Sequence, residues 1–578
     1  MTKPISHQPQ SSTASPASAA ATPLDGLRLA VLEVAEELAF TAPEADGGES
    51  TDKPRAPVRA AITLERPRRA QFGDYSTNAA LLLAPVLGGA PREIAERVGA
   101  ALQARLGSAL ERFEVAGPGF VNLFMADSWL TEGLAEVLAA GESFGGGGAR
   151  EPERVLVEFV SANPTGPMHV GHARNAAYGD ALARMLALHG HIVAREFYVN
   201  DAGSQVGKFG ESIQALARGE DLPEGGYKGD YVAELATQIP QAAAMDADEL
   251  GRAAVTLMVE GIEASLAGFR VQGFDRWFFE SALHEGDPSP VAHSLAILAE
   301  QGSTYEHEGA LWLRTTDFGD DKDRVLVRSN GEHTYFASDI AYHQDKRERG
   351  FQRQIDVWGA DHHGYVLRMK AAYEALGGDP EELELLIMQL VHLMRSGERE
   401  QMSKRAGQFV SLEDLLAEIG VDAARWYLLA RSHDTTVDLD LDLAREQSNE
   451  NPVYYVQYAH ARIASMLARA SIERVNGAVA AVSDGELEPL QPAERALIEQ
   501  LLQFPAELAE AVDRRAPHRI AAYALELAQG FTAFYRDCRV LGADPAIVES
   551  LRISLCVASG RTIACCLSLL GVSTPEHM

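Results

Sequence analysis

The sequence predicts a multidomain α/β protein with three parts: an N-terminal α+β domain, a central domain built on a doubly wound parallel sheet, and an all-α C-terminal domain. The chain has 578 residues, which is too long for a single hydrophobic core. Strand and helix patterns alternate up to about residue 430, whereas from about residue 445 the pattern is helical only. A glycine-rich stretch at 141–154 separates the first part from the second, as a linker would.

Residues 1–24 predict a disordered tail. They are rich in Ser, Ala, Pro and Gln, and Lys3 is the only basic residue before Arg28. This composition lacks the arginines of a transit peptide and the apolar run of a signal peptide. No apolar run in the chain approaches the ~20 residues of a membrane-spanning helix, so we expect a cytoplasmic protein with no membrane partner.

Cysteine usage and charge limit the class of protein further. The four cysteines lie in the last 41 residues without metal-ligand spacing, so we expect reduced core residues and no metal site. The formal net charge of −32 argues against a broadly basic surface. It does not exclude a nucleic-acid partner, because phosphate binding needs positive charge only locally.

Residues 25–145 predict the N-terminal domain. The segments 26–40 and 93–106 have the spacing of amphipathic helices. The segment 113–125 (FEVAGPGFVNLFM) predicts two strands joined by a Gly-Pro-Gly turn. We expect the other parts at these positions: the central domain at 150–430, an insertion within it at about 220–325, and the helical domain at 440–578.

The central domain opens with a continuous apolar strand, RVLVEFV (154–160), as in a buried parallel sheet. A loop rich in Pro and Gly follows, contains His169-Val-Gly171-His172, and leads into a long helical pattern. In a doubly wound sheet, ligands bind where the first strand ends, and the helix N-terminus favours phosphate. His169 and His172 share one face of the first turn and could donate hydrogen bonds to phosphate oxygens. The pattern alone leaves open a loop with two incidental histidines.

A second polar loop, at 399–408, follows the apolar run LELLIMQLVHLM. It contains Gln401-Met-Ser403-Lys404-Arg405, and Lys404 is the last of only eight lysines in the chain. A lysine in a polar loop is a mobile cation suited to a pyrophosphate leaving group. Taken alone, the segment could equally be a solvated surface loop.

Together the two segments resemble the HIGH and KMSK motifs of class I aminoacyl-tRNA synthetases, in the expected order and with VWGADHHGY (357–365) between them. The resemblance implies a Rossmann-like class I synthetase catalytic domain that binds ATP at the first helix, with adenine near Gly171 and Gly359 and the ribose on Asp361. The implied ATP-binding residues are Gly171, Gly359, Asp361, Ser403 and Lys404. The implied catalytic residues are His169, His172 and Lys404.

Longer segments resemble arginyl-tRNA synthetases and cover nearly the whole chain after residue 25. They include VEFVSANPTGPMHVGHARNAAYGDALARML, REFYVNDAGSQV, GADHHGYVLRMKAAYEALG and LDLDLAREQSNENPVYYVQYAHARI. FGDYSTNAALLLA (72–84) resembles the family's additional tRNA-binding domain, which makes Asn78 a candidate tRNA contact. The resemblance implies a ligase that activates arginine with ATP and transfers it to tRNA.

The arginine side chain sets its own chemical requirement. A guanidinium is planar, always charged and carries five donors, so its pocket needs carboxylates and acceptors in a fork. By resemblance, four residues match the family's arginine-contacting positions: Glu158 and Asp339 for charge, Tyr335 for a hydrogen bond to the guanidinium side, and Asn163 for the α-amino group. Without the resemblance, Tyr335 and Asp339 would be read as an ordinary helix start.

The resemblance also implies that the helical domain reads the anticodon. Single-stranded bases are commonly held by stacking on aromatic rings and guanidinium groups. The candidate residues for this contact are Tyr458, Arg462, Tyr535, Arg539 and Met578. The alternative for each tyrosine is a side chain that packs between helices.

One departure from the family pattern concerns charge. Gln401 stands where the family usually has lysine, and Gly166 occupies the position at which some relatives carry a substitute lysine. Lys404 should therefore carry most of the leaving-group stabilisation, together with the Mg²⁺ that accompanies ATP.

The expected partners are tRNA(Arg), arginine and ATP, and the expected form is a monomer. Two other functions stay open at this point. A non-tRNA nucleotidyl transferase of the HxGH superfamily would make a small-molecule adenylate and would not need the flanking domains. A catalytically silent RNA-binding paralogue would be expected to lose His169, His172 or Lys404, and the sequence retains all three.

Overall fold

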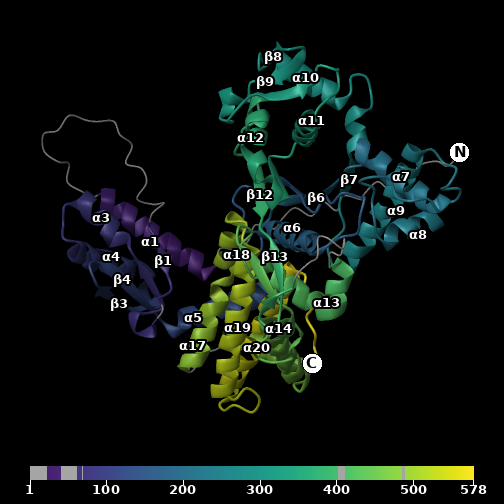
Figure 1. Ribbon diagram of the computed structural model, residues 1–578. Helices are drawn as coiled ribbons and strands as arrows, with labels where there is room; N and C mark the ends of the chain where they lie inside the picture. Colours follow the sequence, from purple (N-terminus) through teal and green to yellow (C-terminus); the bar gives the residue numbers. More distant parts are fainter. Residues whose placement is uncertain (1–21, 41–61, 68, 401–409, 485–488) are drawn as a thin grey trace, which may run out of the picture.

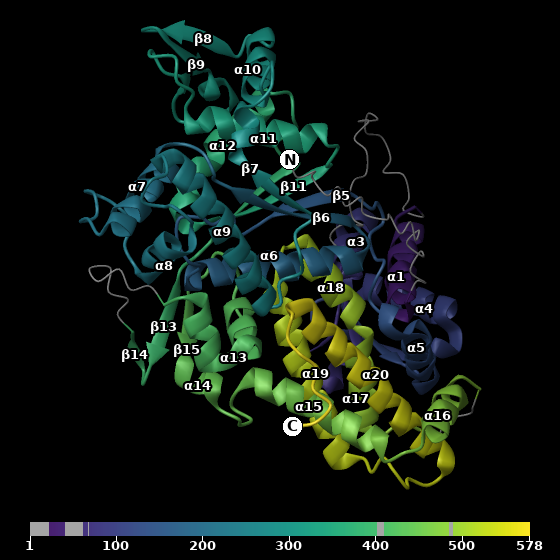
Figure 2. The same ribbon diagram turned by 90° about the vertical axis from the view of Figure 1, so that its right-hand side faces the viewer.

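The computed structural model describes residues 22–40, 62–67, 69–400, 410–484 and 489–578. Most of the predicted tail lies outside these residues, and the first helix begins at Pro23. Figure 1 shows the N-terminal domain at the left, the central sheet in the middle and the helical domain below it. Figure 2 shows helix α6 crossing the molecule between the central sheet and the helical domain.

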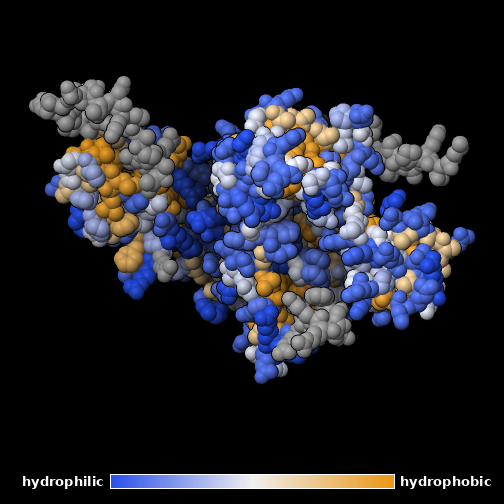
Figure 3. Space-filling view, turned by 45° about the horizontal axis from the view of Figure 1, so that its top comes forward, coloured by the Kyte–Doolittle hydropathy of each residue, from blue (hydrophilic) through white to orange (hydrophobic). Residues whose placement is uncertain are grey.

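The N-terminal domain is a four-stranded antiparallel sheet, in the order β1-β2-β4-β3, packed against helices. Its elements are α1 (Pro23–Phe40), β1 (Leu64–Glu65), η1 (Ala70–Phe72), β2 (Tyr75–Thr77), α3 (Ala79–Leu87), α4 (Pro91–Leu106), η2 (Gly107–Ala109), β3 (Leu110–Ala116) and β4 (Phe120–Met125). The predicted helices at 26–40 and 93–106 and the strand pair at 113–125 are confirmed. Figure 3 shows hydrophobic residues gathered on this domain, at the left of the view, and such patches often mark binding surfaces.

The next helix, α5 (Asp127–Ala140), differs from expectation in its partners. It lies within the range predicted for the N-terminal domain but packs mainly against α17, α16 and α20 of the helical domain. A side chain at Gly133 would come within 2.9 Å of Leu502 on α17, so the glycine permits this close approach. The glycine-rich stretch after α5 is also packed, because Gly147 and Ala149 donate backbone hydrogen bonds to the end of α6. Amphipathic spacing predicts a helix but does not tell which core its apolar face joins.

The central sheet is entirely parallel and has the order β12-β11-β5-β6-β7. Its strands are β5 (Arg154–Glu158), β6 (Ile192–Val199), β7 (Arg276–Phe279), β11 (Arg353–Gly359) and β12 (Leu383–Met388). The chain adds strands outward from β5 in one direction and then returns to add β11 and β12 in the other. The order therefore reverses between β5 and β11, which is where ligands bind in doubly wound folds.

The helices of this domain connect its strands. They are α6 (Val170–His189), α7 (Ser204–Arg218), α11 (Tyr335–Glu348), η6 (Ala360–Tyr365) and α12 (Val366–Ala375). The predicted strand at 154–160, its loop and its long helix are confirmed as β5, the following turn and α6.

The residues predicted as one insertion, 220–325, fall into more than one unit. Helices α8 (Asp230–Gln238) and α9 (Ala247–Gly268) pack with α7 around a small core of their own. β7 lies inside the predicted range yet pairs with β6 at the edge of the central sheet, and its four residues are too few to show a period. Beyond it follow η4 (Glu280–His284), α10 (Pro290–Glu300), β8 (Thr304–His307), β9 (Ala310–Leu313), η5 (Thr315–Phe318) and β10 (Arg324–Val327).

A junction unit joins the central domain to the helical domain. It consists of β13 (Val391–Arg395), β14 (Glu398–Arg399), α13 (Leu412–Leu429), β15 (Val437–Asp440) and α14 (Leu441–Arg445). Arg425 of α13 is fully buried, pairs with Asp180 of α6 at 2.6 Å and donates to the Leu570 carbonyl oxygen at the end of α20. One guanidinium therefore ties together three parts of the fold.

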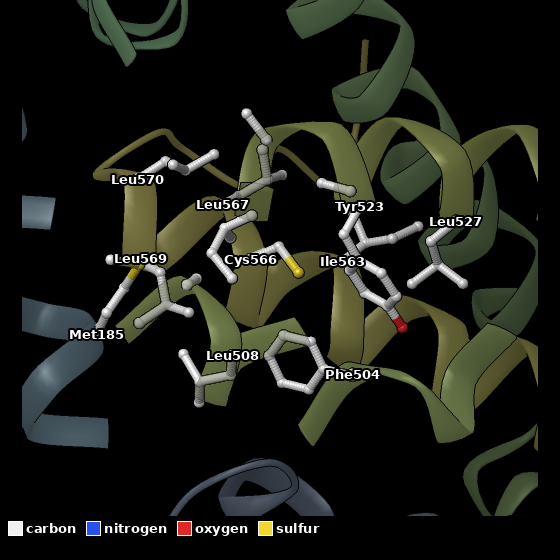
Figure 4. Close-up of a cluster of buried hydrophobic side chains, with 14 of the residues drawn as sticks. Met185, Phe504, Leu508, Tyr523, Leu527, Ile563, Cys566, Leu567, Leu569 and Leu570 are labelled. Carbon is white, nitrogen blue, oxygen red and sulfur yellow. The ribbon is translucent and has the colours of Figure 1, made fainter. Parts of the chain in front are cut away.

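The described residues beyond the junction form helices only, as predicted. These are α15 (Pro452–Ala468), α16 (Ile472–Asp484), α17 (Pro492–Leu502), α18 (Phe504–Asp513), α19 (Pro517–Asp537) and α20 (Ala546–Leu570). Helix α20 is long and apolar enough to span a membrane, but 78% of its most apolar window is buried inside the protein. Figure 4 shows why, since Ile563, Cys566 and Leu567 of α20 pack among side chains of α18 and α19. All four cysteines are free thiols.

Candidate active site

The turn after β5 shapes the floor of the site. Val160 and Ser161 adopt positive φ values of 69° and 41°, which non-glycine residues rarely do. Asn175 of α6 holds this turn, because its side chain accepts from the Val160 N–H at 2.6 Å and donates to the Val357 carbonyl of β11 at 2.7 Å. Such strain persists where the surroundings fix it, commonly at functional sites. The turn lies at the point where the strand order reverses.

The two motif histidines stack on each other at the N-terminus of α6. Their ring centroids are 3.7 Å apart and the planes differ by 20°. His169 is the N-cap residue, and its Nδ1 accepts from the Gly171 N–H at 3.1 Å. The His172 Nδ1 accepts from the His169 N–H at 3.4 Å. Because each Nδ1 is an acceptor, the neutral rings hold their protons on Nε2, which can donate to a phosphate oxygen.

Burial keeps both rings uncharged. It lowers the pKa of His169, and it lowers the pKa of His172 to about 3 with a further contribution from the neighbouring ring. The pair can therefore supply two hydrogen bonds to phosphate but no positive charge near pH 7. Charge compensation must come from elsewhere in the site.

The glycines predicted for nucleotide binding lie close to other predicted site residues. A Cβ on Gly171 would lie 3.0 Å from the His169 ring and would disturb the histidine stack. A Cβ on Gly359 would lie 2.6 Å from the Asp361 carboxylate. Asp361 is exposed beside His362 at the end of β11, on the β11 side of the strand reversal. These positions fit the predicted adenine and ribose contacts.

The second motif lies outside the described residues, which exclude 401–409, so the structure does not place Gln401, Ser403, Lys404 or Arg405. The segment that follows it is anchored to the first motif. The Leu412 N–H donates to the Met168 carbonyl at 2.9 Å, and Ser411 pairs with His169 in a β-bridge. The segment that begins at Ser411 therefore lies directly beside the histidine pair.

The predicted arginine residues separate into two groups. Tyr335 and Asp339 lie on the first turns of α11, as predicted; Tyr335 is exposed, and Asp339 accepts a hydrogen bond from the Tyr365 hydroxyl at 2.6 Å. Asn163 is exposed in the loop after β5. Burial raises the pKa of Asp339, and the Tyr365 bond opposes this shift.

Glu158 belongs to a different environment, a buried ion network beneath the turn. Its carboxylate accepts from Ser161 Oγ at 2.7 Å and from Lys346 Nζ at 2.6 Å. The fully buried Lys346 also pairs with Asp356 at 2.7 Å, and Asp356 in turn pairs with His343 at 2.8 Å. Both Glu158 oxygens are thus engaged within the protein in this structure.

A carboxyl group that the sequence did not reveal lies close to Asp339. Glu280 of η4 is buried and hydrogen-bonds to the Tyr198 hydroxyl. Burial raises its pKa to about 7, and Asp339 and Asp201 contribute to the rise. The Tyr335 hydroxyl would lie 3.6 Å from a Cβ on Gly203, near Asp201. We call Asp201, Glu280 and Asp339 the acidic cluster. The one sequence signal was a glutamate directly after a strand of the central sheet.

Four of the five predicted anticodon residues line one cavity of about 260 Å³ in the helical domain: Tyr458, Arg462, Tyr535 and Met578. The Arg462 guanidinium lies 4.9 Å from the Tyr458 ring centroid and 5.4 Å from that of Tyr535. Arg539 does not line this cavity and donates to the Leu541 carbonyl oxygen instead.

A second cavity, of about 440 Å³, lies on the N-terminal domain. Its lining includes Arg66, Arg69, Phe72, Phe120 and Asn122. Phe72 and Phe120 are 41% and 39% exposed, so their rings are open to a ligand. The predicted residue Asn78 is not in this cavity; it precedes α3 and its side chain accepts from the Thr63 N–H at 2.8 Å.

Comparison with known proteins covers every part of this architecture. The family models that match are the arginyl tRNA synthetase N terminal domain at residues 31–125, the class I (R) tRNA synthetase catalytic domain at 134–221 and 287–464, and the DALR anticodon binding domain at 456–578. The arginine--tRNA ligase of Desulfosudis oleivorans is 46% identical over 533 residues, 89% of this chain and 95% of the relative. That of Geobacillus thermodenitrificans is 45% identical with similar coverage.

The chain belongs to the arginyl-tRNA synthetase family. Among solved structures, the arginyl-tRNA synthetase of Thermus thermophilus matches with a TM-score of 0.72 and 25% identity, over 96% of this chain and 99% of that one. A methionyl-tRNA synthetase of Mycobacterium tuberculosis shares the class I fold at 14% identity and a TM-score of 0.52. The predicted arginyl-tRNA synthetase resemblance and three-part fold are confirmed.

Proposed function

We propose that this chain is an arginine–tRNA ligase in which ATP lies across the N-terminus of α6 and arginine lies against the acidic cluster. The observation that carries the proposal is that two chemistries lie at the carboxyl ends of the central strands, with the histidine pair after β5 and Asp201 and Glu280 after β6 and β7. Two neutral histidines with protons on Nε2 suit a polyphosphate, and buried carboxyl groups suit a guanidinium.

The reaction needs no nucleophile from the protein. The arginine carboxylate, already ionised, attacks the α-phosphorus of ATP; the new C–O–P linkage forms as the bond to pyrophosphate breaks. A hydroxyl of the terminal tRNA adenosine then attacks the carbonyl carbon and releases AMP. His169 and His172 hydrogen-bond to the phosphates, and Lys404 supplies the positive charge that the neutral histidines lack. ATP enters as its magnesium complex, a substrate.

The two cavities are the proposed tRNA contacts. Tyr458, Arg462, Tyr535 and Met578 hold anticodon bases in the helical domain, where stacking on tyrosine and arginine is available. In the N-terminal domain, Phe72 and Phe120 offer rings to an unpaired base and Arg69 offers charge to its phosphates, while Arg66 at the same cavity pairs with Glu499 at 2.7 Å. Both surfaces are completed within one chain, which suits a monomer acting in the cytoplasm.

The two alternatives fit less well. A nucleotidyl transferase that makes small-molecule adenylates has no use for an anticodon binding domain and a tRNA synthetase N-terminal domain, and both families match here. A silent paralogue has no need to preserve the histidine stack and its capping bonds.

The deciding experiment is arginine-dependent exchange of pyrophosphate into ATP, measured with and without tRNA(Arg). We expect exchange with arginine and not with citrulline, its neutral isostere. Asp339→Asn should raise the arginine KM by roughly 10- to 100-fold, because a hydrogen bond to a charged group contributes about 1.5–3 kcal/mol, and should leave the ATP KM nearly unchanged. Equal effects on both substrates would contradict the assigned pocket.

A further inference from the structure

The third member of the acidic cluster, Asp201, is engaged differently from the other two. It follows β6, in the segment between Val199 and Gly203. Its Oδ1 accepts from the Ser281 backbone N–H at 2.8 Å, and its Oδ2 accepts from Ser281 Oγ at 2.7 Å. Each carboxylate oxygen therefore holds one group of the same residue.

Ser281 is the residue directly after Glu280, in the first turn of η4. η4 is a short 3-10 helix, and its N-cap residue, Phe279, makes no side-chain capping bond. Two hydrogen bonds to one carboxylate fix both the backbone and the rotamer at this position. The orientation of the preceding residue, Glu280, is then set by the two bonds between Ser281 and Asp201.

We infer that Asp201 is a positioning residue for arginine recognition: by holding Ser281, it fixes the first turn of η4 and so places the Glu280 carboxyl beside Tyr198 and Asp339. The inference rests on the proposed function, since it assigns a role within the proposed arginine pocket. In this proposal Asp201 acts through Ser281, which donates to both of its carboxylate oxygens, while Glu280 and Asp339 face the guanidinium.

The groups that surround Glu280 agree with this role. Tyr198 approaches Glu280 from β6 and Asp339 approaches it from α11. Asp201 contacts the next residue, Ser281. Three acidic groups around one site repel one another unless a cation joins them. A fixed Glu280 thus contributes a carboxyl at a defined place, which a planar guanidinium requires for a paired contact.

The experiment compares Asp201→Ala with Asp201→Asn in steady-state exchange kinetics at saturating tRNA. The alanine removes both hydrogen bonds, so the arginine KM should rise about tenfold while the ATP KM changes less than about twofold. Asparagine can keep both bonds, because its amide oxygen accepts from the N–H and its amide nitrogen donates to Ser281 Oγ. We therefore expect Asp201→Asn to restore the arginine KM to within about threefold of the parent.

A matched control lies in the small β8–β10 sheet. There Asp323 Oδ1 accepts from both the Thr316 N–H at 3.2 Å and Thr316 Oγ1 at 2.8 Å, so a carboxylate outside the acidic cluster again holds the backbone and side chain of a single residue. Asp323→Ala should leave the arginine KM unchanged. Thermal unfolding of each variant separates a loss of folded protein from a change in KM.

The decisive comparison repeats Asp201→Ala in a Glu280→Gln background. If Asp201 acts through Glu280, the second change should add less than about twofold to the arginine KM, since the carboxyl that it places is already gone. An undiminished tenfold effect in that background, or equal rises in the arginine and ATP KM, would overturn the inference. If Glu280→Gln alone left the arginine KM unchanged, the proposed pocket itself would fail, and that result is distinct from the other two.

Discussion

Glu280 makes arginine binding sensitive to pH. Its pKa is raised to about 7, first by burial and then by Asp339 and Asp201. A cation binds the ionised form better, so bound arginine opposes protonation of this group. The arginine KM should therefore fall as pH rises from about 6 to 8, by up to roughly tenfold for one full titration step.

Steady-state exchange over this pH range measures the effect, with the ATP KM as an internal control. Glu280→Gln should raise the arginine KM and flatten its dependence on pH. A slope that persists in the glutamine variant would assign the titration to another group.

We propose that Lys404 carries the positive charge that the histidines lack. Gln401 and Gly166 provide no second lysine, and the His172 ring stays neutral because its pKa is lowered to about 3. Removing one preorganised stabiliser of transition-state charge costs ~100- to 1,000-fold in kcat. The Lys404→Ala change should lower the single-turnover rate of adenylate formation by this factor when tRNA is present. The Lys404→Arg change should recover part of the lost rate. A loss below about tenfold would point to Arg405 or another cation.

Single residues show clearly where sequence reasoning succeeds and where it stops. His169 and His172 form one short motif on one helix turn, and their placement followed from the strand–loop–helix pattern. Glu280 could not be found in this way, because Tyr198, Glu280 and Asp339 come from three segments that only the sheet order brings together. Glu158 matched a motif position, but its partner Lys346 lies 188 residues away.

At the scale of elements, helix α8 braces the loop that precedes the histidines. The Tyr231 hydroxyl donates to the Thr165 carbonyl at 2.9 Å. Tyr231→Phe removes this bond and should lower kcat/KM for ATP by roughly 2- to 10-fold without changing the arginine KM. Tyr227→Phe is the control, because Tyr227 packs against the same Phe209 ring in the same three-helix unit. Similar losses in both variants would indicate a general packing effect.

Helix α5 determines where the chain can be shortened. A truncated chain that begins at Asp127 keeps α5, whereas one that begins at residue 150 loses it and exposes apolar surface on α17 and α20. Leu130, Leu134 and Leu138 are buried, and each buried leucine contributes ~1.5–3 kcal/mol. We expect the shorter chain to unfold at a clearly lower temperature in a circular dichroism melt.

The truncated chain that begins at Asp127 should retain the stability that α5 provides, together with the arginine-dependent exchange activity. It should bind tRNA more weakly than the full chain. Unchanged tRNA affinity would contradict the role proposed for the N-terminal cavity.

Elements were predictable where they are long and periodic. The 20 residues of α6 and the helices after residue 445 show their period plainly, whereas the four residues of β7 show none. The sequence also placed residues 127–140, which form α5, in the nearer domain, because the period of a helix carries no information about a distant partner.

At the scale of the whole molecule, α13 links the histidine pair to the C-terminal segment that reaches the cavity of the helical domain. Its N-terminus bonds to Met168 beside the histidines, and Asp422 farther along accepts from the Ser573 N–H at 2.8 Å. Ser573 begins the segment that ends at Met578 in the anticodon cavity. Asp422→Ala should therefore lower tRNA-stimulated exchange by several-fold while the tRNA-independent rate stays constant. An equal loss in both rates would indicate damage confined to the catalytic domain.

The position of α5 has a consequence for the folding of the chain during its synthesis on the ribosome. Asp127 at its start accepts from the Leu490 N–H, and the two residues are 363 positions apart in the chain. At a translation rate of about 5–20 residues per second, roughly 20–70 s pass between their synthesis. During that interval the partners of α5 in the helical domain, α16, α17 and α20, have not yet been synthesised. The N-terminal sheet can fold early, but the nascent polypeptide must keep α5 soluble until the last quarter of the chain emerges from the ribosome. We therefore expect a chaperone to bind the nascent chain at α5.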